Sequence, residues 1–290
     1  MTILLTGATG FLGSHILDAL VAQGHTVIIL KRSSSKLNRI KHLINNIVMY
    51  DIDKQHLADI FKKFHIEMII HCATNYGRSQ RKADEIVEAN LMLPLKLLLL
   101  GIEHGIKTFI NTDTLLDKRV NEYSLSKKQF LDWLKIYSDS IYAINIALEH
   151  FYGPNDDPSK FTTYVIKSML DHVKQLDLTL GQQKRDFIYI DDVVEVFLTL
   201  VNSIKNESCG FIEYEVGTGE LTTIEEFVKM VKVITINENT LLNFGAVPYR
   251  KNEPMESHVN LIALKKLGWE AKIDLLEGLK KTILIEENNI

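Results

Sequence analysis

A glycine-rich turn directly after a short apolar run is the feature that most constrains the fold of this chain. Ile3–Thr6 is predicted to be a buried strand, and Phe11–Gln23 carries apolar residues at helical spacing. Between them, Gly7, Gly10 and Gly13 stand in Gly-x-x-Gly-x-x-Gly spacing. A tight turn also uses glycines, but a strand, this turn and a helix in that order favour a dinucleotide site, where the helix N-terminus binds phosphate. The expected contacts are Gly7, Thr9, Gly10, Phe11, Leu12 and Gly13.

The rest of the first half repeats this alternation of apolar runs and helical patterns. Continuous apolar runs suit strands that are buried on both faces of a parallel sheet. Short links between strands and helices predict an α/β protein, with a Rossmann-type doubly wound parallel sheet and a smaller C-terminal α/β lobe. The expected later strands are Thr26–Leu30, Asn46–Tyr50, Met68–Cys72, Lys107–Asn111 and Ile141–Ala147, and the expected helices include His56–Phe64, Ala83–His104 and Tyr123–Tyr137.

A turn-forming cluster at Gly153–Pro158 marks a change of character along the chain. Beyond it, helical patterns are separated by short strands. We therefore expect a dinucleotide-binding domain over residues 1–150 and a substrate-binding lobe over residues 151–290. Part of the second range, such as 186–205, is expected to pack back on the first domain.

Composition and charge exclude several classes of protein. The 290-residue chain is 46% hydrophobic and 24% charged, as expected of a globular protein, and its net charge of −4 gives no general attraction to nucleic acid. The cysteines and histidines show no metal-ligand spacing. The start of the chain lacks a signal-peptide pattern, and Leu91–Ile102 is too short to span a bilayer. We expect a cytoplasmic protein with no metal, no nucleic-acid partner and no membrane partner.

The end of the second strand predicts which dinucleotide binds. An acidic residue there accepts the ribose hydroxyls of NAD, whereas this chain has Lys31 and Arg32. The planar guanidinium of Arg32 suits the 2′-phosphate of NADP, which favours NADPH; a solvated basic loop is the other interpretation. Asp51, after the third strand, is placed to contact the adenine amino group or to cap the following helix. The expected cofactor contacts here are Lys31, Arg32, Asp51 and Ile52.

Tyr123 and Lys127 form a Tyr-x-x-x-Lys pair at the start of a predicted helix. Their spacing places both side chains on one helix face, where the ammonium lowers the pKa of the tyrosine. A packed ring and a solvated cation give the same pattern. Phe109–Thr114 ends a strand in hydroxyl groups, at the sheet edge where ligands bind. Thr112 is the candidate group that hydrogen-bonds the reacting oxygen. The candidate catalytic residues are Thr112, Tyr123 and Lys127, the last two also contacting the cofactor.

Several motifs occur together along the whole chain. They are Thr6–Gly13, Asp51, Cys72-Ala73-Thr74, Asn90, Thr112, the Tyr123/Lys127 pair, Phe151-Tyr152-Gly153-Pro154 and Arg185–Val193. With them the chain resembles the extended short-chain dehydrogenase/reductase superfamily, which contains sugar-nucleotide epimerases, dehydratases and reductases. The resemblance implies a nucleotide-sugar substrate and a nicotinamide dinucleotide. It adds Cys72, Ala73, Thr74 and Asn90 to the expected cofactor contacts.

A second set of motifs indicates one group within this superfamily. It comprises Ala73–Gly77, Asn111–Thr114, Leu148–Pro154, Lys160-Phe161, Tyr214–Gly219 and Phe244–Ala246. Here the chain is similar to the synthases of CDP-abequose and CDP-paratose, which reduce the 4-keto group of a CDP-3,6-dideoxyhexose. A sister group that makes dTDP-D-fucose from dTDP-4-keto-6-deoxyglucose is the other open interpretation.

Three departures from the wider family pattern favour net reduction by exchangeable NADPH. Dehydratases carry a glutamate, the base for the C5 proton, where this chain has Thr114. Only ten residues separate Thr112 from Tyr123, which shortens a loop over the sugar relative to epimerases and dehydratases. Enzymes that recycle a retained NAD are expected to carry an acid in place of Lys31 and Arg32.

The resemblance also implies contacts to the substrate. Arg185 and Arg250 match positions where arginines meet the diphosphate, a task that suits bidentate geometry. An internal ion pair with Asp186 is the alternative for Arg185, and loop packing is the alternative for Tyr76 and Arg78. The expected substrate contacts are Tyr76, Arg78, Thr112, Asp113, Thr114, Lys160, Arg185, Arg250 and Glu253.

These features together predict an NADP-dependent oxidoreductase. It would reduce the 4-keto group of a nucleotide-activated deoxyhexose or dideoxyhexose, for surface polysaccharide such as O-antigen. The alternatives are a sugar-nucleotide 4-epimerase that recycles NAD, and a non-catalytic NADP-sensing protein. The two domains are then an NADP-binding domain and a sugar-nucleotide-binding lobe. Family members commonly pair through two long helices, which here implies a homodimer through the helices around 83–104 and 123–137.

Overall fold

The structure, a computed structural model, describes residues 1–78, 82–204 and 208–288. The chain divides into two compact units. Unit 1 comprises Met1–Leu148 and Val194–Tyr214, and unit 2 comprises Glu149–Val193 and Glu215–Ile290. The segment that returns to unit 1 therefore begins at Val194, whereas the sequence placed it over 186–205, of which residue 205 lies outside the described residues.

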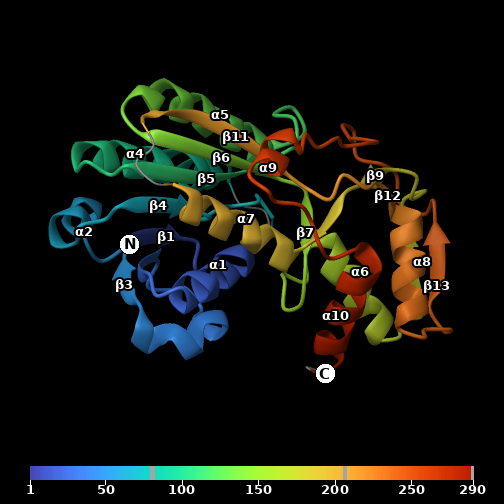
Figure 1. The fold of residues 1–290 in the computed structure, drawn as a ribbon. Helices are drawn as coiled ribbons and strands as arrows, with labels where there is room; N and C mark the ends of the chain where they lie inside the picture. Colours follow the sequence, from blue (N-terminus) through green and yellow to red (C-terminus); the bar gives the residue numbers. More distant parts are fainter. Residues whose placement is uncertain (79–81, 205–207, 289–290) are drawn as a thin grey trace. The chain divides into compact units, whose positions relative to one another are not determined.

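Unit 1 is built on a seven-stranded parallel sheet with the strand order β11-β6-β5-β4-β1-β2-β3 (Figure 1). Leu4 on β1, for example, lies opposite Ile28 on β2 and Ile69 on β4. The order runs outward in both directions from β1, as in a doubly wound Rossmann sheet, so the expected fold class is confirmed. The strands are β1 (Thr2–Thr6), β2 (Thr26–Lys31), β3 (Val48–Asp51), β4 (Met68–His71), β5 (Thr108–Thr114), β6 (Tyr142–Leu148) and β11 (Gly210–Val216).

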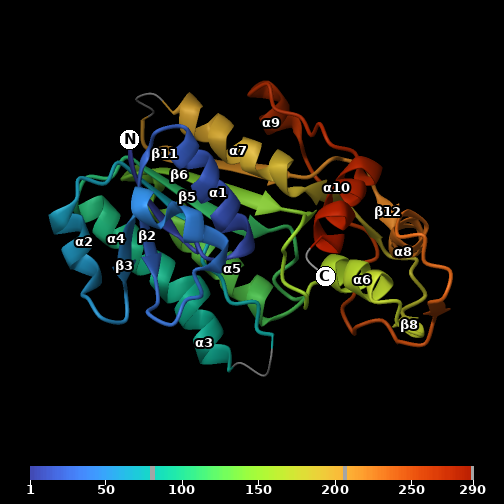
Figure 2. The same cartoon turned by 90° about the horizontal axis from the view of Figure 1, so that it is seen from below.

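Helices cover both faces of this sheet. Figure 2 shows α1 and α7 on one face and α3 and α5 on the other. On the α5 face, one hydrophobic core joins Ile69 and Phe109 of the strands to Leu97 on α4 and Phe130 on α5. Each such buried side chain contributes about 1.5–3 kcal/mol. The helical elements are α1 (Phe11–Ala22), η1 (Asn38–Asn46), α2 (Leu57–Lys63), α3 (Ala83–Val87), η2 (Glu88–Met92), α4 (Leu93–Glu103), α5 (Glu122–Ile136), η3 (Tyr137–Asp139) and α7 (Ile190–Ser203).

Strand β5 is longer than its sequence indicated. The expected strand ended at Asn111, but β5 continues to Thr114, which lies opposite Leu148 at the end of β6. All seven residues of β5 are buried, so its polar end obtains its hydrogen bonds from the protein interior. The hydroxyl groups that were expected at the end of the strand lie within its paired part.

The long helix expected over Ala83–His104 is divided into three elements. A π-helical turn, η2, separates α3 from α4, and it holds the fully buried Asn90. A π turn inserts one extra residue into a helix and is frequent at functional sites. Here it rotates the two helical parts so that Asn90 faces inward.

Unit 2 combines short strand pairs with helices. β7 (His150–Tyr152) pairs in parallel with β10 (Phe187–Tyr189), and aromatic rings from these strands form part of the core, with Phe187 stacked on Phe227 at 4.4 Å between centroids. The other strands are β8 (Gln175–Leu178), β9 (Lys184–Arg185), β12 (Thr222–Thr223) and β13 (Leu241–Phe244). The helices are α6 (Phe161–Leu170), α8 (Ile224–Ile234), α9 (Ile262–Lys266) and α10 (Leu275–Glu287).

Candidate active site

The glycine turn brings β1, α1 and the loop after β4 into close approach. Gly7 has φ = 72°, and a Cβ there would lie 2.6 Å from Ala73 N. A Cβ at Gly13 would overlap the Gly7 carbonyl. The N–H of Gly10 donates to that carbonyl at 2.9 Å. The turn thus leaves no space for side chains at Gly7 and Gly13, and it exposes the start of α1, as phosphate binding requires.

Replacing Gly13 by alanine is expected to destabilise the protein by about 3 kcal/mol, because the new methyl group overlaps backbone that cannot move without displacing β1. The control is Gly24→Ala. Unlike Gly13, Gly24 has a positive φ of 78°, but no atom lies within 4 Å of its added Cβ, so only the backbone conformation destabilises this variant, by about 1 kcal/mol. Urea unfolding of the two variants measures the difference. Equal destabilisation would contradict the close approach.

At the end of β2, the two cations have different surroundings. The ammonium of Lys31 is largely buried and forms an ion pair with Asp51. Arg32 is exposed. Lys31 and Asp51 therefore pair with each other, and their direct contact with the cofactor stays a prediction. Arg32 is the cation at this strand end that faces solvent. Ile52 donates its N–H to the Lys31 carbonyl, which joins the ends of β2 and β3.

The loop after β4 is fixed from two sides. Thr6 Oγ1 accepts the N–H groups of Cys72 and Ala73 at 3.2 and 3.1 Å. Asn90 accepts from Thr74 Oγ1 and from Asn75 N, and donates to Asn75 O and to Ser126 Oγ. All four hydrogen-bonding positions of the Asn90 amide are used. The Asn90 side chain thus positions the loop, and its expected contact with the cofactor stays a prediction.

The start of α5 places Tyr123 and Lys127. Asn121 caps the helix through a reciprocal capping box with Ser124, so the helix begins at Glu122. Lys127 lies one turn after Tyr123 and is 1% exposed. Burial lowers the pKa of Lys127 to about 8, against the opposing effect of Asp113. Among the described residues, none hydrogen-bonds the buried Nζ of Lys127.

This orphaned ammonium tests whether a nicotinamide dinucleotide fits. A buried polar atom without a partner costs free energy unless a ligand satisfies it. Ribose hydroxyls are acceptors that would satisfy Lys127, and the glycine turn accommodates a pyrophosphate. Both features fit a dinucleotide that lies along the carboxyl ends of the central strands.

Tyr123 sits among groups that keep its phenol neutral. Burial raises the pKa of Tyr123 well above its usual value, and Tyr76 and Asp113 add to the increase, so the expected lowering of this pKa beside Lys127 was wrong. The ring centroids of Tyr123 and Tyr76 are 5.0 Å apart, and the Arg78 guanidinium lies over the Tyr76 ring at 4.9 Å. The structure thus brings Tyr76 and Arg78 to Tyr123. A neutral phenol at working pH is a proton donor.

The three polar residues at the end of β5 have separate surroundings. Thr112 Oγ1 donates to the carbonyl of His71 at 2.9 Å. The Asp113 side chain is fully buried and forms an ion pair with Lys128 at 2.9 Å. Asp113 also accepts from Thr114 N, so its carboxylate is engaged with protein groups, and its expected contact with substrate stays a prediction. Lys128 was missed because nothing in the sequence distinguishes it from a surface lysine beside Lys127.

A row of polar side chains crosses the sheet beneath this site. Thr6 is hydrogen-bonded to His71, Asn111 donates to Asn145 at 2.7 Å, and Asn145 donates to Glu213 at 2.7 Å. His71 lies opposite both Thr6 and Asn111 in the strand register. Burial, with a further effect of Lys127, holds the pKa of His71 well below its usual value, so this imidazole is neutral.

The substrate residues expected in unit 2 are mostly engaged with protein groups. Arg185 donates to Lys184 O and Pro254 O at 2.7 Å each and pairs with Glu253. This corrects the ion pair considered with Asp186, whose carboxylate instead accepts from Thr218 and Gly219.

Lys160 and Arg250, the other two cations expected to contact the substrate, have different surroundings. Lys160 pairs with Asp156 at 2.9 Å and lies over the Phe151 ring at 4.2 Å, and its expected contact with substrate stays a prediction. Arg250 is exposed. Burial lowers the pKa of Arg185, and the nearby positive charge of Arg250 adds to this effect. Of the two expected arginines, Arg250 is the one whose side chain faces solvent.

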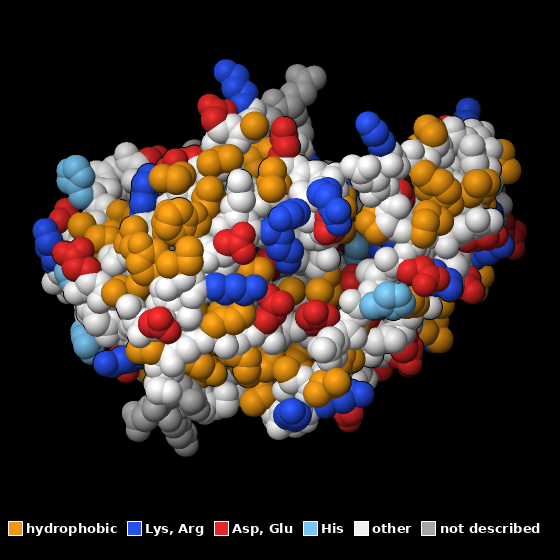
Figure 3. Space-filling model, turned by 90° about the horizontal axis from the view of Figure 1, so that it is seen from above, with side chains coloured by type: hydrophobic (Ala, Val, Ile, Leu, Met, Phe, Trp, Pro, Cys, Tyr) orange, Lys and Arg blue, Asp and Glu red, His pale blue; other side chains and the backbone are white. Residues whose placement is uncertain are grey.

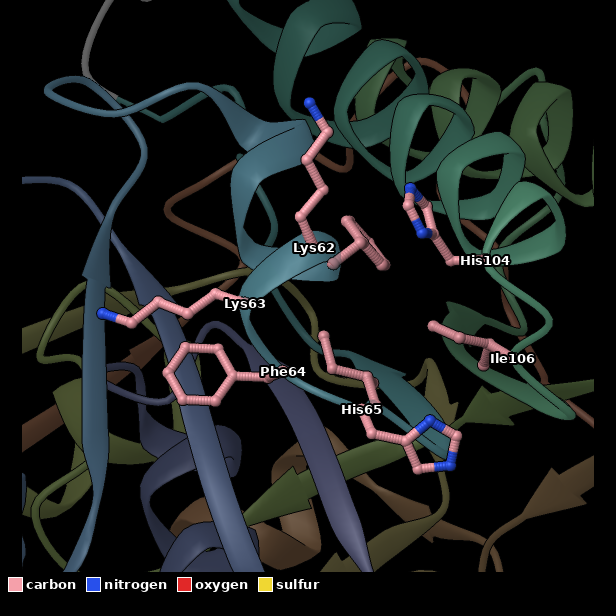
Figure 4. A pocket seen from close by; sticks show the side chains of 8 residues that line it. Lys62, Lys63, Phe64, His65, His104 and Ile106 are labelled. Carbon is pink, nitrogen blue, oxygen red and sulfur yellow. The ribbon is translucent and has the colours of Figure 1, made fainter.

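The hollow in Figure 4 lies away from this site. It has a volume of about 250 Å³ and is lined by residues that surround the starts of β4 and β5, including Ile66 and Ile106. In Figure 4, Lys63 and Phe64 point away from the side on which His104 and Ile106 lie. The Tyr123 cluster belongs to the opposite, carboxyl ends of the strands, where open α/β sheets bind ligands.

Over residues 1–78, 82–204 and 208–288, no helix has the length and apolar character needed to cross a membrane. The same residues contain no group of three or more His, Cys, Asp or Glu side chains that could hold a metal ion.

The fold and site define a Rossmann protein with a glycine phosphate turn and a Tyr/Lys pair whose lysine is buried. Residues 3–217 match the NAD dependent epimerase/dehydratase family. The chain belongs to this family, whose members are extended short-chain dehydrogenases/reductases. The resemblance inferred from the motifs is thereby confirmed.

Individual relatives extend over the whole chain. The chain is 37% identical to a CDP-abequose synthase of Salmonella muenchen, with 98% of each chain covered. It is 32% identical to a CDP-abequose synthase of Salmonella typhimurium, with 97% of each covered. Among solved structures, a UDP-glucose 4-epimerase of Thermotoga maritima with UDP-glucose superposes with a TM-score of 0.88 at 27% identity, covering 100% of this chain and 99% of that one.

Proposed function

We propose that this chain is an NADPH-dependent reductase of the 4-keto group of a nucleotide-activated deoxyhexose or dideoxyhexose, in the synthesis of surface-polysaccharide sugars. The observation that carries the proposal is a neutral, half-buried Tyr123 whose neighbour at the end of β5 is Thr114, a residue that cannot remove a carbon-bound proton. The 37% identity to a CDP-abequose synthase supports a CDP-activated substrate.

The cofactor is assigned to the residues whose atoms remain available. Bound NADPH supplies a hydride to the carbonyl carbon. The N-terminus of α1 and the glycine turn hold the pyrophosphate, and Lys127 Nζ holds the ribose next to the nicotinamide. Arg32 holds the 2′-phosphate, because it is exposed while Lys31 is paired with Asp51.

Arg32→Gln is expected to weaken NADPH binding about 10- to 100-fold, since a hydrogen-bonded charge contributes about 1.5–3 kcal/mol. NADH lacks the 2′-phosphate, so its affinity should remain the same. The control is Lys36→Gln, which removes one positive charge from an exposed position in the same loop. Fluorescence titration with both dinucleotides measures the result. An equal loss of NADPH affinity in both variants would mean that Arg32 acts only through its general positive charge, and would contradict a direct contact with the 2′-phosphate.

Within unit 1, Tyr123 and its neighbours carry out the proton transfer of the reduction. As the carbonyl oxygen gains negative charge, Tyr123 donates its proton to that oxygen. Lys127 keeps the ribose in place and stabilises the phenolate that remains. Tyr76 and Arg78 lie beside the Tyr123 ring and are assigned to the sugar.

The nucleotide diphosphate is assigned to unit 2. Arg250 offers an exposed guanidinium. Arg185 and Glu253 form an ion pair with each other and would have to break it to bind a substrate directly. We therefore assign them to positioning the site rather than to direct contact with the diphosphate. Lys160 keeps its bond to Asp156, and its contact with the substrate stays a prediction.

The test is incubation with CDP-4-keto-3,6-dideoxyglucose and with dTDP-4-keto-6-deoxyglucose. NADPH absorbance follows turnover, and NMR assigns the configuration at C4 of the product. We expect stoichiometric NADPH consumption with one of the two. If neither ketone consumes NADPH, the reductase proposal is wrong.

A 4-epimerase that recycles its own NAD is the second candidate, favoured by the 27% identity to the Thermotoga maritima epimerase. It would interconvert sugar-nucleotide epimers with no added NADPH. A dinucleotide that remains bound through purification would favour this candidate over the reductase.

Homodimerisation is also proposed. Hydrophobic side chains gather on the side of unit 1 formed by α4 and α5 (Figure 3). They include Leu99, Trp133 and Ile136, which are 41%, 41% and 65% exposed. Exposed apolar clusters of this kind mark protein–protein contacts, and these helices are the ones that the family resemblance assigns to pairing.

A further inference from the structure

Two hydrogen-bond donors directly follow Arg32 in the loop after β2. Ser33 is exposed, and its N–H and its hydroxyl both donate to the carboxylate of Asp53, the N–H at 2.9 Å. The N–H of Arg32 is used differently, since it donates to Ser35 Oγ at 3.2 Å. An N–H and a hydroxyl that point at one carboxylate form an arrangement that binds an anion. The anion that these two donors hold in the protein is the Asp53 side chain.

The pairing of β2 with β3 brings Asp53 to this loop. Lys31 lies opposite Asp51 in the strand register, and the Ile52 N–H donates to the Lys31 carbonyl at 2.9 Å. Ser33 and Asp53 each lie two residues beyond the end of their strand, and so they meet. The hydrogen bonds from Ser33 lower the pKa of Asp53, which keeps its carboxylate ionised at neutral pH. A negative charge therefore lies at the strand end to which the 2′-phosphate is assigned.

A 2′-phosphate and a 2′-hydroxyl respond to this carboxylate in opposite ways. The phosphate carries close to two negative charges and needs donors for its oxygens. Arg32 offers a guanidinium, but the donors of Ser33 are held by Asp53, whose charge also repels the phosphate. A ribose hydroxyl has no charge, and it can donate to a carboxylate. Asp53 thus opposes NADPH without opposing NADH.

We propose that Asp53 is a specificity-determining residue for the dinucleotide, because its carboxylate competes with the 2′-phosphate for the donors of Ser33. NADPH binds when the Asp53 side chain turns away and Ser33 donates to the phosphate instead. NADH binds with the pair of Asp53 and Ser33 intact. The inference rests on the proposed NADPH site beside Arg32, and it does not depend on which ketone is reduced.

The experiment measures the affinities for NADP⁺ and NAD⁺, which differ only in the 2′-phosphate, by calorimetric titration without substrate. Asp53→Asn keeps the size of the side chain and removes its charge. It is expected to tighten NADP⁺ binding about 10-fold, the effect of removing one charge close to a phosphate, and to change NAD⁺ binding less than about twofold. The matched control is Asp59→Asn, which removes an exposed carboxylate of α2 that lies 3.9 Å from Lys62. Screening by salt should keep its effect on both affinities below about twofold.

A second substitution separates competition for Ser33 from repulsion alone. Added to Asp53→Asn, Ser33→Ala should remove most of the gain in NADP⁺ affinity, because the phosphate then loses the hydroxyl donor. An unchanged or lower ratio of NADP⁺ to NAD⁺ affinity in Asp53→Asn, an equal rise in Asp59→Asn, or a gain that survives Ser33→Ala overturns the proposal. A wild-type protein that prefers NAD⁺ would contradict the assignment of NADPH as cofactor. The change of the ratio in Asp53→Asn would still decide the role of Asp53.

Discussion

Tyr123→Phe is expected to lower kcat about 1000-fold while leaving NADPH affinity unchanged. The substitution removes only the phenol oxygen, and the ring keeps its contact with Tyr76 at 5.0 Å. General acid catalysis by a positioned side chain contributes about 10²- to 10⁴-fold. Burial raises the pKa of Tyr123 well above its usual value, so the donor stays protonated through neutral pH. We therefore expect the wild-type rate to show no loss from Tyr123 ionisation between pH 6 and pH 9.

Stopped-flow absorbance of NADPH with saturating keto sugar measures this effect. The control is Tyr137→Phe. Tyr137 directly follows α5, and its ring stacks on that of Trp133. Removal of the Tyr137 hydroxyl therefore shows how much kcat changes when a tyrosine of this region is altered away from the site. NADPH titration by fluorescence checks that binding persists. A Tyr123→Phe enzyme that retains a tenth of the wild-type kcat would remove Tyr123 from the role of proton donor.

Lys127→Met is expected to make the cofactor-free protein more stable and inactive. Burial lowers the pKa of Lys127 from 10.5 to about 8, which means that the folded protein holds this proton less tightly than the unfolded chain. Below pH 8 the buried ammonium therefore costs stability, about 3 kcal/mol at pH 7. The cost falls as the pH rises from about 8 toward 10.5, because the folded protein then carries neutral lysine. Methionine fills a similar volume without the charge.

Urea unfolding of the cofactor-free protein at pH 7 and pH 10 tests this prediction. The gain from Lys127→Met should shrink to about 1 kcal/mol at pH 10. Lys128→Met is the matched control and should have the opposite sign. It removes the partner of the fully buried Asp113 carboxylate, and breaking a buried ion pair costs about 3 kcal/mol or more. Destabilisation by both substitutions at pH 7 would show that Lys127 is a structural residue.

The fold followed from the sequence because its signals are local. The glycine turn and the apolar runs each depend on a few adjacent residues, and β1, α1 and β2 form close to where they were expected. The π turn at Glu88–Met92 has no such signal. It exists because Asn90 must reach the loop after β4 and Ser126 on α5 at once.

The site was predicted less completely because a residue type does not reveal its partner. Asp113, Asn90 and Arg185 have the chemistry of ligand-binding groups. In each case the structure supplies a protein partner from a distant part of the chain: Lys128, Asn75 or Glu253. The clustering of Tyr76 and Arg78 on Tyr123 also depends on tertiary contacts.

The polar row beneath the site also bears on how the sheet assembles. Runs such as Ile3–Leu5 and Met68–Ile70 are apolar throughout, so hydrophobic burial alone would tolerate a shifted pairing of the strands. A shift by one residue would separate Thr6 from His71 and Asn111 from Asn145. Each separation would leave buried donors and acceptors unpaired, at about 1–3 kcal/mol per group. The hydrogen bonds among the polar residues beneath the active site therefore also favour the correct alignment of the strands over a shifted one.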